Sequence, residues 1–254
     1  MGLKTAAQIE QMRPAGRFVA SVLTSLREVA APGMTLKDLD EHAHAMIRDA
    51  GARSVYLGYH PEFGAAPYPG VLCTSINDAA LHGLPSDQVL APGDLVSIDF
   101  AAEVDGWVAD SAISFQLPPT TPDAQRLIAV TSAALDAAIA AARVGGRMGD
   151  ISSAIGQVGR DAGYGINADF GGHGVGRTMH EDPHVPNLGR RRSGQRLKAG
   201  LVIAIEPWFM AGGDGYVIDP DGWTIRSADG SLTAHVEHTV ALTDTGPVVL
   251  TARD

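Results

Sequence analysis

The chain has 254 residues with 19 basic and 29 acidic side chains, which gives a net charge of −10, and it contains one cysteine, Cys73. The acidic balance argues against a general binder of nucleic acid or membrane surfaces, and a lone cysteine excludes both an intramolecular disulfide and a structural zinc site built from cysteines. Because no apolar run opens the chain and no uncharged apolar stretch reaches the roughly 18 residues that a membrane span needs, we expect a cytoplasmic globular protein.

Four segments carry apolar residues at helical spacing. They cover residues 14–30, 35–50, 122–143 and 149–162. Thr35 and Asp38 stand in capping-box positions, and Thr121 precedes a proline at the first helical position. Gly51 and Gly163 follow the second and fourth segments, as expected at helix ends. Pro14 is interpreted as the start of the first helix.

Alternating and apolar segments predict strands over residues 70–76, 93–101, 107–115, 201–207, 214–218, 223–226 and 234–242. The elements repeat in the same order in two halves, about 14–115 and 122–245, and each half has two helices, a His-Gly pair and an apolar strand with a carboxylate at its end. We interpret the whole chain, 1–254, as one internally duplicated domain. Chance resemblance of two helix–strand units is the alternative.

Two carboxylates occupy positions that should be buried. Asp99 ends the predicted strand Leu-Val-Ser-Ile, and Asp110 follows eleven residues later, after Asp105-Gly106. Asp-Gly is a strong signal for a two-residue hairpin. That turn would place Asp110 opposite Ala101, diagonal to Asp99 on the same face, at roughly 7–8 Å between Cα atoms. Two buried carboxylates repel each other and are costly to desolvate, and a divalent cation would remove both problems.

The second half repeats this pattern. Glu206 ends Leu-Val-Ile-Ala-Ile, Glu237 lies within an alternating segment, and His173 stands among glycines. Each acid alone could be a solvated strand end. Together, four carboxylates would neutralise two divalent ions, which favours a two-metal site over a one-metal site. Oxygen-rich ligation with one imidazole suits Mn, Fe, Co or Zn.

Three other patterns have simpler interpretations. The segment His180 to His184 has the spacing of the zinc-peptidase motif H-E-x-x-H, but Pro183 argues against the helix that this motif requires. The glycines at 172–176 lack the spacing of a dinucleotide loop. The basic residues at 190–198 are interpreted as a solvated loop, with a ribosome or RNA contact as the alternative. Cys73 is interpreted as a small buried side chain and not as a nucleophile.

Taken together, several segments resemble the type I methionine aminopeptidases. The resemblance runs in order from about residue 5 to 251 and rests on residues 77–83, 93–99, 105–110, 172–177, 180–183, 205–207 and 236–239. It implies an α+β, pita-bread fold with a curved antiparallel sheet around a dinuclear metal centre. It also implies removal of the initiator methionine from nascent chains by a monomeric enzyme that prefers a small second residue.

The resemblance assigns roles to individual residues. It implies that the metal ligands are Asp99, Asp110, His173, Glu206 and Glu237. Asp110 and Glu237 would bridge both ions, and Glu206 would also move protons. His82 and His180 would face the substrate. The side chains that it places near the methionine pocket are Tyr59, Tyr68, Cys73 and Trp223.

Three features depart from the family pattern. Residues 61–67 resemble an insertion beside the pocket tyrosines, His235 replaces an expected amide or other polar residue, and we expect no N-terminal zinc-finger extension. Met179 stands where bacterial members often have an aromatic residue. Two alternatives stay open. One is an X-Pro peptidase of the same fold, which would carry a further N-terminal domain, and the other is a binding protein that has lost its metals.

Overall fold

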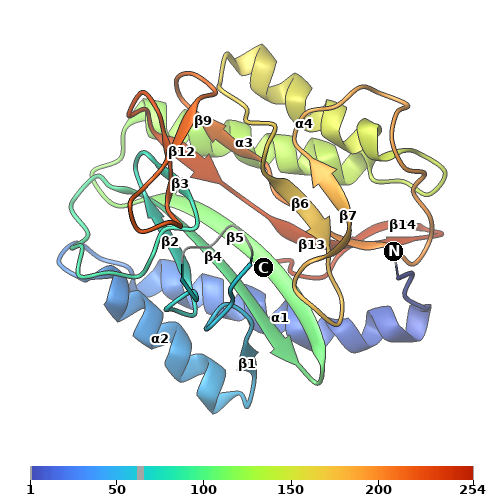
Figure 1. The fold of residues 1–254 in the computed structure, drawn as a ribbon, viewed down its shortest axis with the longest axis horizontal. Coiled ribbons are helices and arrows are strands. Elements are labelled where there is room, and N and C mark those ends of the chain that lie inside the picture. Colours follow the sequence, from blue (N-terminus) through green and yellow to red (C-terminus); the bar gives the residue numbers. More distant parts are fainter. Residues whose placement is uncertain (1, 62–65, 254) are drawn as a thin grey trace.

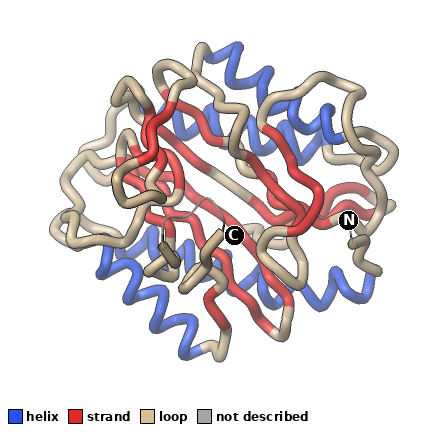
Figure 2. Tube along the Cα trace, viewed as in Figure 1, coloured by secondary structure: helices blue, strands red, loops and turns tan. Residues whose placement is uncertain are grey.

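The computed structural model describes residues 2–61 and 66–253. Within these ranges the helices are α1 (Ala6–Val29), α2 (Leu36–Asp49), α3 (Pro122–Ala141) and α4 (Met148–Ala162). The α+β class is confirmed. Figure 1 shows α1 and α2 on one side of the strands and α3 and α4 on the other, and Figure 2 shows the strands running between the two helical layers.

Two helices begin where their caps predict, and a third ends where its glycine predicts. Thr35 and Asp38 form the expected capping box of α2, the Thr121 side chain accepts from the Ala124 N–H at the start of α3, and α4 ends at Gly163 with a left-handed backbone. The predicted start of the first helix is wrong. It begins after Thr5, which forms a capping box with Gln8, and Pro14 lies inside the helix.

The reason for this difference is the apolar face of the first turns. Ile9 and Met12 lie on it and are buried, with 5% and 0% of their surfaces exposed. Each such side chain contributes about 1.5–3 kcal/mol when it leaves water. Together they offset the cost of about 3 kcal/mol that a proline carries inside a helix, where it lacks a donor and its ring crowds the carbonyl four residues earlier.

The strands of the described ranges form antiparallel sheets. The largest has the order β14 (Gly246–Val249), β13 (His238–Thr243), β8 (Val202–Ile205), β6 (Gly171–Gly174), β7 (Glu181–Pro186). A second joins β1 (Arg53–Ser54), β2 (Cys73–Ile76), β4 (Leu95–Val104) and β5 (Trp107–Gln116). Shorter pairings join β3 (Ala79–Leu81), β11 (Ile225–Ser227) and β10 (Tyr216–Ile218), and β9 (Trp208–Met210) with β12 (Thr233–His235). The sequence did not predict β1, β3, β6, β7, β9 or β14.

The predicted hairpin is confirmed. Asp105 and Gly106 both have positive φ, at 53° and 75°, between β4 and β5. Ala101 pairs with Asp110 in the register that the turn predicted. Asp99 lies within the ten-residue strand β4 and not at its end, since the strand continues to Val104.

The predicted strand 234–242 is interrupted at Val236 and Glu237. Its first part, β12, pairs with β9, and its second part, β13, pairs with β8. At the interruption the Glu237 backbone bonds in both directions with Ala112 of β5, at 3.1 and 3.4 Å. This contact joins the two halves of the chain and brings Glu237 beside Asp110.

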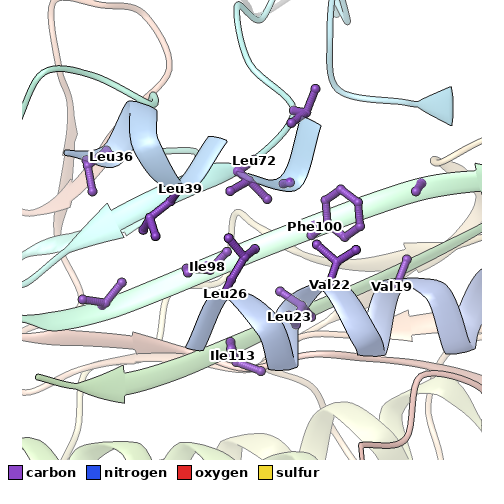
Figure 3. Packing of buried hydrophobic residues seen from close by; sticks show 14 of the residues in the cluster. Val19, Val22, Leu23, Leu26, Leu36, Leu39, Leu72, Ile98, Phe100 and Ile113 are labelled. Atoms are coloured by element: carbon purple, nitrogen blue, oxygen red, sulfur yellow. The ribbon is translucent and has the colours of Figure 1, made fainter. Parts of the chain in front are cut away.

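Two large apolar cores lie between the helical layers and the strands. Figure 3 shows Val22, Leu23 and Leu26 of α1 packed against Ile98 and Phe100 of β4, with α2 closing the other side. The second core packs α3 and α4 against the second-half strands. Replacing a fully buried leucine such as Leu23 by alanine should cost about 2–5 kcal/mol.

Among the described helices, α3 has the length and hydropathy of a membrane span. The core helix of a soluble protein meets the same test, and α3 buries Leu127 and Leu135 in the second core. The basic residues at 190–192, 196 and 198 are exposed. Most of the predicted insertion 61–67 lies outside the described residues.

Candidate active site

One pocket collects every site residue that the sequence indicated. Its lining consists of Tyr56, Tyr59, Tyr68, Cys73, His82, Asp99, Asp110, His173, Met179, His180, Glu206, Trp223 and Glu237. Residues from both halves of the chain, up to 181 positions apart, therefore face the same space. Tyr56 is the lining residue that the sequence analysis did not single out.

A different part of the fold positions each of the four carboxylates. Asp99 lies on β4 and Asp110 on β5, and their side chains share a face. Glu237 is fixed by its backbone bonds to β5, and Glu206 follows the last residue of β8. The Asp110 N–H donates to Thr239 Oγ1 at 2.9 Å, and the Thr239 hydroxyl donates back to the Asp110 carbonyl at 2.8 Å. Hydrogen bonds of the backbone therefore fix the positions of Asp110 and Glu237 within the cluster.

His173 reaches the carboxylates because β6 lies very close to its neighbours. A Cβ atom at Gly172 would stand 2.1 Å from the Ala204 carbonyl oxygen of β8, and one at Gly174 would stand 2.3 Å from the Asp182 carbonyl oxygen of β7. Only glycine fits at these two positions. The glycines flanking His173 therefore allow the strand to enter the sheet and project the imidazole into the pocket.

The donor set fits a divalent cation. His173 Nδ1 lies 2.9 Å from the Gly174 carbonyl, an acceptor only, so Nδ1 carries the proton in the neutral ring. His173 Nε2 then presents a lone pair to Asp110 Oδ2 at 3.7 Å and Glu206 Oε1 at 3.8 Å. Ligand atoms of Asp110, His173 and Glu237 lie within 4.8 Å of one another, and the buried Glu237 Oε1 has no hydrogen-bond partner. Several lone pairs facing one another in a buried space are stabilised by a cation between them.

The electrostatics of the cluster agree with this interpretation. Burial, and then the charge of Asp110, raise the pKa of Asp99 and of Glu237 well above the usual range. Burial also raises the pKa of Asp110. Burial acts to raise the pKa of Glu206, but the contact with His235, and then the positive charge of His173 when its ring is protonated, hold it below its usual value. Burial is the largest influence on all four carboxylates, and repulsion between neighbouring carboxylates adds to it for Asp99, Asp110 and Glu237.

Aromatic side chains form the other wall of the pocket. The rings of Tyr56 and Trp223 contact the ring of Tyr68 edge to face, with centroids 6.0 and 5.1 Å apart. Cys73 and Met179 add sulfur atoms to this wall, and both are buried. Burial and the charge of Asp99 raise the pKa of the Cys73 thiol well above its usual value, so the thiol stays protonated, as its interpretation as a small buried side chain requires.

Two histidines, His82 and His180, line the same pocket as the carboxylates and the aromatic rings. Burial lowers the pKa of His82 to about 4 and that of His180 to about 3, so both are neutral near pH 7. The Tyr59 hydroxyl lies 2.8 Å from His180 Nδ1. The centroid of the His180 ring lies 4.2 Å from that of the His173 ring, and the two rings are nearly perpendicular. Both histidines therefore border the space that the carboxylates face.

Sequence reasoning missed the contacts that Tyr56 makes. Its hydroxyl donates to Asp99 Oδ1 at 2.6 Å and lies 3.1 Å from Asp110 Oδ1. Tyr56 stands in the irregular segment after β1, where no periodicity marks it. His235, the departure from the family pattern, lies with its Nε2 3.6 Å from Glu206 Oε2. Both side chains contact the carboxylate cluster, and Tyr56 does so as part of the pocket lining.

The zinc-peptidase interpretation is excluded by the backbone. Residues 181–186 form strand β7, so His180 and His184 do not share a helix face. His184 is exposed and does not line the pocket. The glycines at 172–176 belong to β6 and the turn after it, and no helix follows them there.

Comparison with known proteins identifies the family. A model of metallopeptidase family M24 matches residues 10–244. Methionine aminopeptidase 1 of Mycobacterium tuberculosis is 46% identical over 98% of this chain and 94% of the relative, and methionine aminopeptidase of Aquifex aeolicus is 44% identical over 98% of each. The crystal structure of methionine aminopeptidase from Thermotoga maritima superposes with a TM-score of 0.94 at 35% identity, over 100% of both chains.

More distant structures share only the fold. The prolidase from Pyrococcus horikoshii superposes with a TM-score of 0.76 at 20% identity, and this chain spans 64% of its length. An X-Pro peptidase is thus a remote neighbour, while the methionine aminopeptidases match from end to end. The chain has the pita-bread fold and belongs to metallopeptidase family M24, within it to the methionine aminopeptidases.

Proposed function

We propose that this protein removes the N-terminal methionine from peptides and nascent polypeptides, preferring a small second residue, with two divalent ions as cofactors. The proposal rests on one observation, which is that two different groups of side chains form the two walls of one pocket. One wall is the carboxylate–imidazole cluster, and the other is the aromatic and sulfur-containing surface around Tyr68. The first suits hydrolysis and the second suits a linear thioether side chain.

The ligands would be Asp99, Asp110, His173, Glu206 and Glu237, which all face the pocket. Their combined charge of −4 suits two divalent ions such as Co, Mn, Fe or Zn better than one. Bound there, such ions would supply Lewis-acid polarisation, an anchor for the free α-amino group and a water of lowered pKa. The requirement for a free amine would make the enzyme an exopeptidase.

Three side chains would move or hold protons. Glu206 would accept a proton from the attacking water and return one to the leaving amine, since its pKa is held low enough for it to begin as a carboxylate. If the Tyr59 hydroxyl donates to His180 Nδ1, the proton of the neutral ring sits on Nε2. His180 Nε2 would then donate to the substrate carbonyl oxygen as negative charge develops there. His82 would position the scissile amide.

The methionine side chain would lie against Tyr68, Cys73 and Trp223. Trp223 is fixed by donation from its Nε1 to the Ala66 carbonyl at 3.0 Å, and the Tyr68 hydroxyl lies 2.8 Å from the Leu72 carbonyl oxygen. Both rings are therefore held by backbone groups. A rigid apolar wall of this kind discriminates by shape, at about 1–3 kcal/mol per methylene group.

A peptide assay tests the proposal. Chelator-treated protein given Mn²⁺ or Co²⁺ should release methionine from Met-Ala-Ser, and release little from Met-Lys-Ser and nothing from Ala-Pro. Hydrolysis of Ala-Pro alone would identify an X-Pro peptidase and refute the proposal. Replacing His180 by alanine should lower kcat on Met-Ala-Ser by about 10²–10³-fold, the usual cost of losing an oxyanion donor. A loss within threefold would refute the role of His180.

A further inference from the structure

Glu181 adjoins His180 but takes no part in the proposed chemistry. Its side chain does not line the pocket. One carboxylate oxygen accepts from the Lys4 ammonium at 2.6 Å. The other accepts from the backbone N–H of Arg177 at 2.7 Å and of Thr178 at 3.4 Å. Glu181 therefore ties the turn that precedes His180 to a residue 177 positions away.

Lys4 is held in this place by backbone as well as by charge. Its N–H donates to the Gly200 carbonyl at 2.7 Å. Its side chain is 7% exposed and runs across Gly176, where a Cβ atom would stand 2.5 Å from Lys4 Cε. Figure 1 shows the N-terminal end of the chain near β14, at the edge of the large sheet. The Lys4 side chain is thus enclosed, which is uncommon for a lysine, while the Glu181 side chain is 21% exposed.

The turn 176–180 has a second anchor on its opposite side. The guanidinium of Arg177 lies 3.6 Å from the ring centroid of Trp107, and its Nη1 donates to the Gly106 carbonyl at 2.7 Å. The Val108 N–H donates to the Gly176 carbonyl at 2.8 Å. These contacts fix one flank of the turn to the β4–β5 hairpin. The Lys4–Glu181 pair fixes the other flank.

The end of this turn carries two pocket residues, Met179 and His180. The Thr178 hydroxyl donates to the His180 carbonyl at 3.2 Å, so a shift of the turn carries the His180 backbone with it. Burial would raise the pKa of Glu181, but Lys4 and the two amide donors keep it below the usual value. Without Lys4 the Glu181 carboxylate would turn towards solvent, and the backbone N–H groups of Arg177 and Thr178 that it binds would shift with it.

We propose that Lys4 is a positioning residue for His180, acting through Glu181 and the turn 176–180. This inference rests on the proposed function, because it takes His180 to act in turnover. Displacing a catalytic group by on the order of 1 Å can cost about 10²-fold in rate. Since the Arg177 anchor remains, we expect the partial displacement in Lys4→Met to lower kcat on Met-Ala-Ser by roughly tenfold, with KM changing less than kcat.

The test is a double-mutant comparison with metal-loaded protein. Lys4→Met keeps the length of the side chain and removes its charge, and it is combined with His180→Ala. In the His180→Ala background, Lys4→Met should change kcat by less than about twofold, because its target is already absent. Lys37→Met is the matched control, since it breaks an exposed pair, Lys37 with Asp87, and should leave kcat unchanged. Mn²⁺ affinity measured by calorimetry should stay within threefold in each variant.

The outcomes separate this inference from the proposed function. If His180→Ala lowers kcat about 10²-fold while Lys4→Met costs less than twofold, this inference alone fails. An equal loss in both backgrounds, or a Mn²⁺ affinity lowered tenfold, would also overturn it, since Lys4 would then act elsewhere. If His180→Ala costs little, both fail. Should Lys4→Met not fold, Glu181→Gln must reproduce the same pattern, and failure of both variants to fold would reduce the pair to a stability element.

Discussion

The Tyr56 hydroxyl offers the sharpest single-atom test of the metal site. It donates to Asp99 Oδ1 at 2.6 Å and lies 3.1 Å from Asp110 Oδ1, and the ring is 6% exposed. Tyr56→Phe removes this hydroxyl and keeps the ring that packs on Tyr68. A hydrogen bond to a charged acceptor contributes about 1.5–3 kcal/mol, and the loss of a partner that orients a metal ligand usually costs 10–100-fold in affinity. We therefore expect Mn²⁺ affinity to fall by about 10–100-fold.

Calorimetric titration of chelator-treated protein with Mn²⁺ measures this directly. Tyr59→Phe is the matched control, because its hydroxyl contacts His180 and not the carboxylates. Its Mn²⁺ affinity should stay within threefold of wild type while its turnover falls. If Tyr56→Phe binds Mn²⁺ as tightly as wild type or more tightly, the reasoning is refuted. Tighter binding would show that the hydroxyl competes with the ion for the carboxylates and does not orient them.

Three further predictions follow from the charges of the site. Asp110→Asn should raise the melting temperature of chelator-treated protein at pH 7.5 by a few degrees, because it relieves repulsion with Asp99 and Glu237. The same change should abolish the stabilisation of the protein by Mn²⁺. A melting temperature below that of wild type without metal would contradict this reasoning. His82 has a folded-state pKa of about 4, below its unfolded value, so its contribution to stability is lost as pH falls from 6.5 towards 4. Urea titrations of metal-free protein should therefore show wild type losing on the order of 3 kcal/mol relative to His82→Gln over that interval, and a constant difference would refute the shift. Glu206→Gln should lower kcat by about 10²–10⁴-fold, and saturating Mn²⁺ should not restore it; restoration would show that Glu206 acts only as a ligand.

The sequence best predicted the turns and helix starts that depend on neighbouring residues alone. Asp105-Gly106 determines a hairpin of defined twist, and that hairpin places Asp110 opposite Ala101. Thr35 and Thr121 mark their helix starts because their side chains satisfy backbone N–H groups. The family resemblance named eleven site residues, and all of them line one pocket. Their individual roles stay predictions until the variants are measured.

The sequence could not predict features that depend on distant contacts. Residues 234–242 alternate as one strand would, and the change of partner at Glu237 comes from β5, more than a hundred residues earlier. Pro14 matches the preference of proline for the first turn of a helix, but the burial of Ile9 and Met12 extends the helix in the N-terminal direction to Ala6. The Lys4–Glu181 pair joins two segments that no local pattern connects. Such features arise from packing and have no periodicity to reveal them.

We propose that this pocket hydrolyses the peptide bond after an N-terminal methionine with the help of two divalent ions. The direct measurement is a parallel titration of chelator-treated protein with Mn²⁺, which follows heat of binding and release of methionine from Met-Ala-Ser. We predict two binding events, both lost in Asp110→Asn, with full activity only after the second. Full activity at one equivalent with no second event would contradict the two-ion claim, and methionine release that persists in metal-free protein would contradict the claim as a whole.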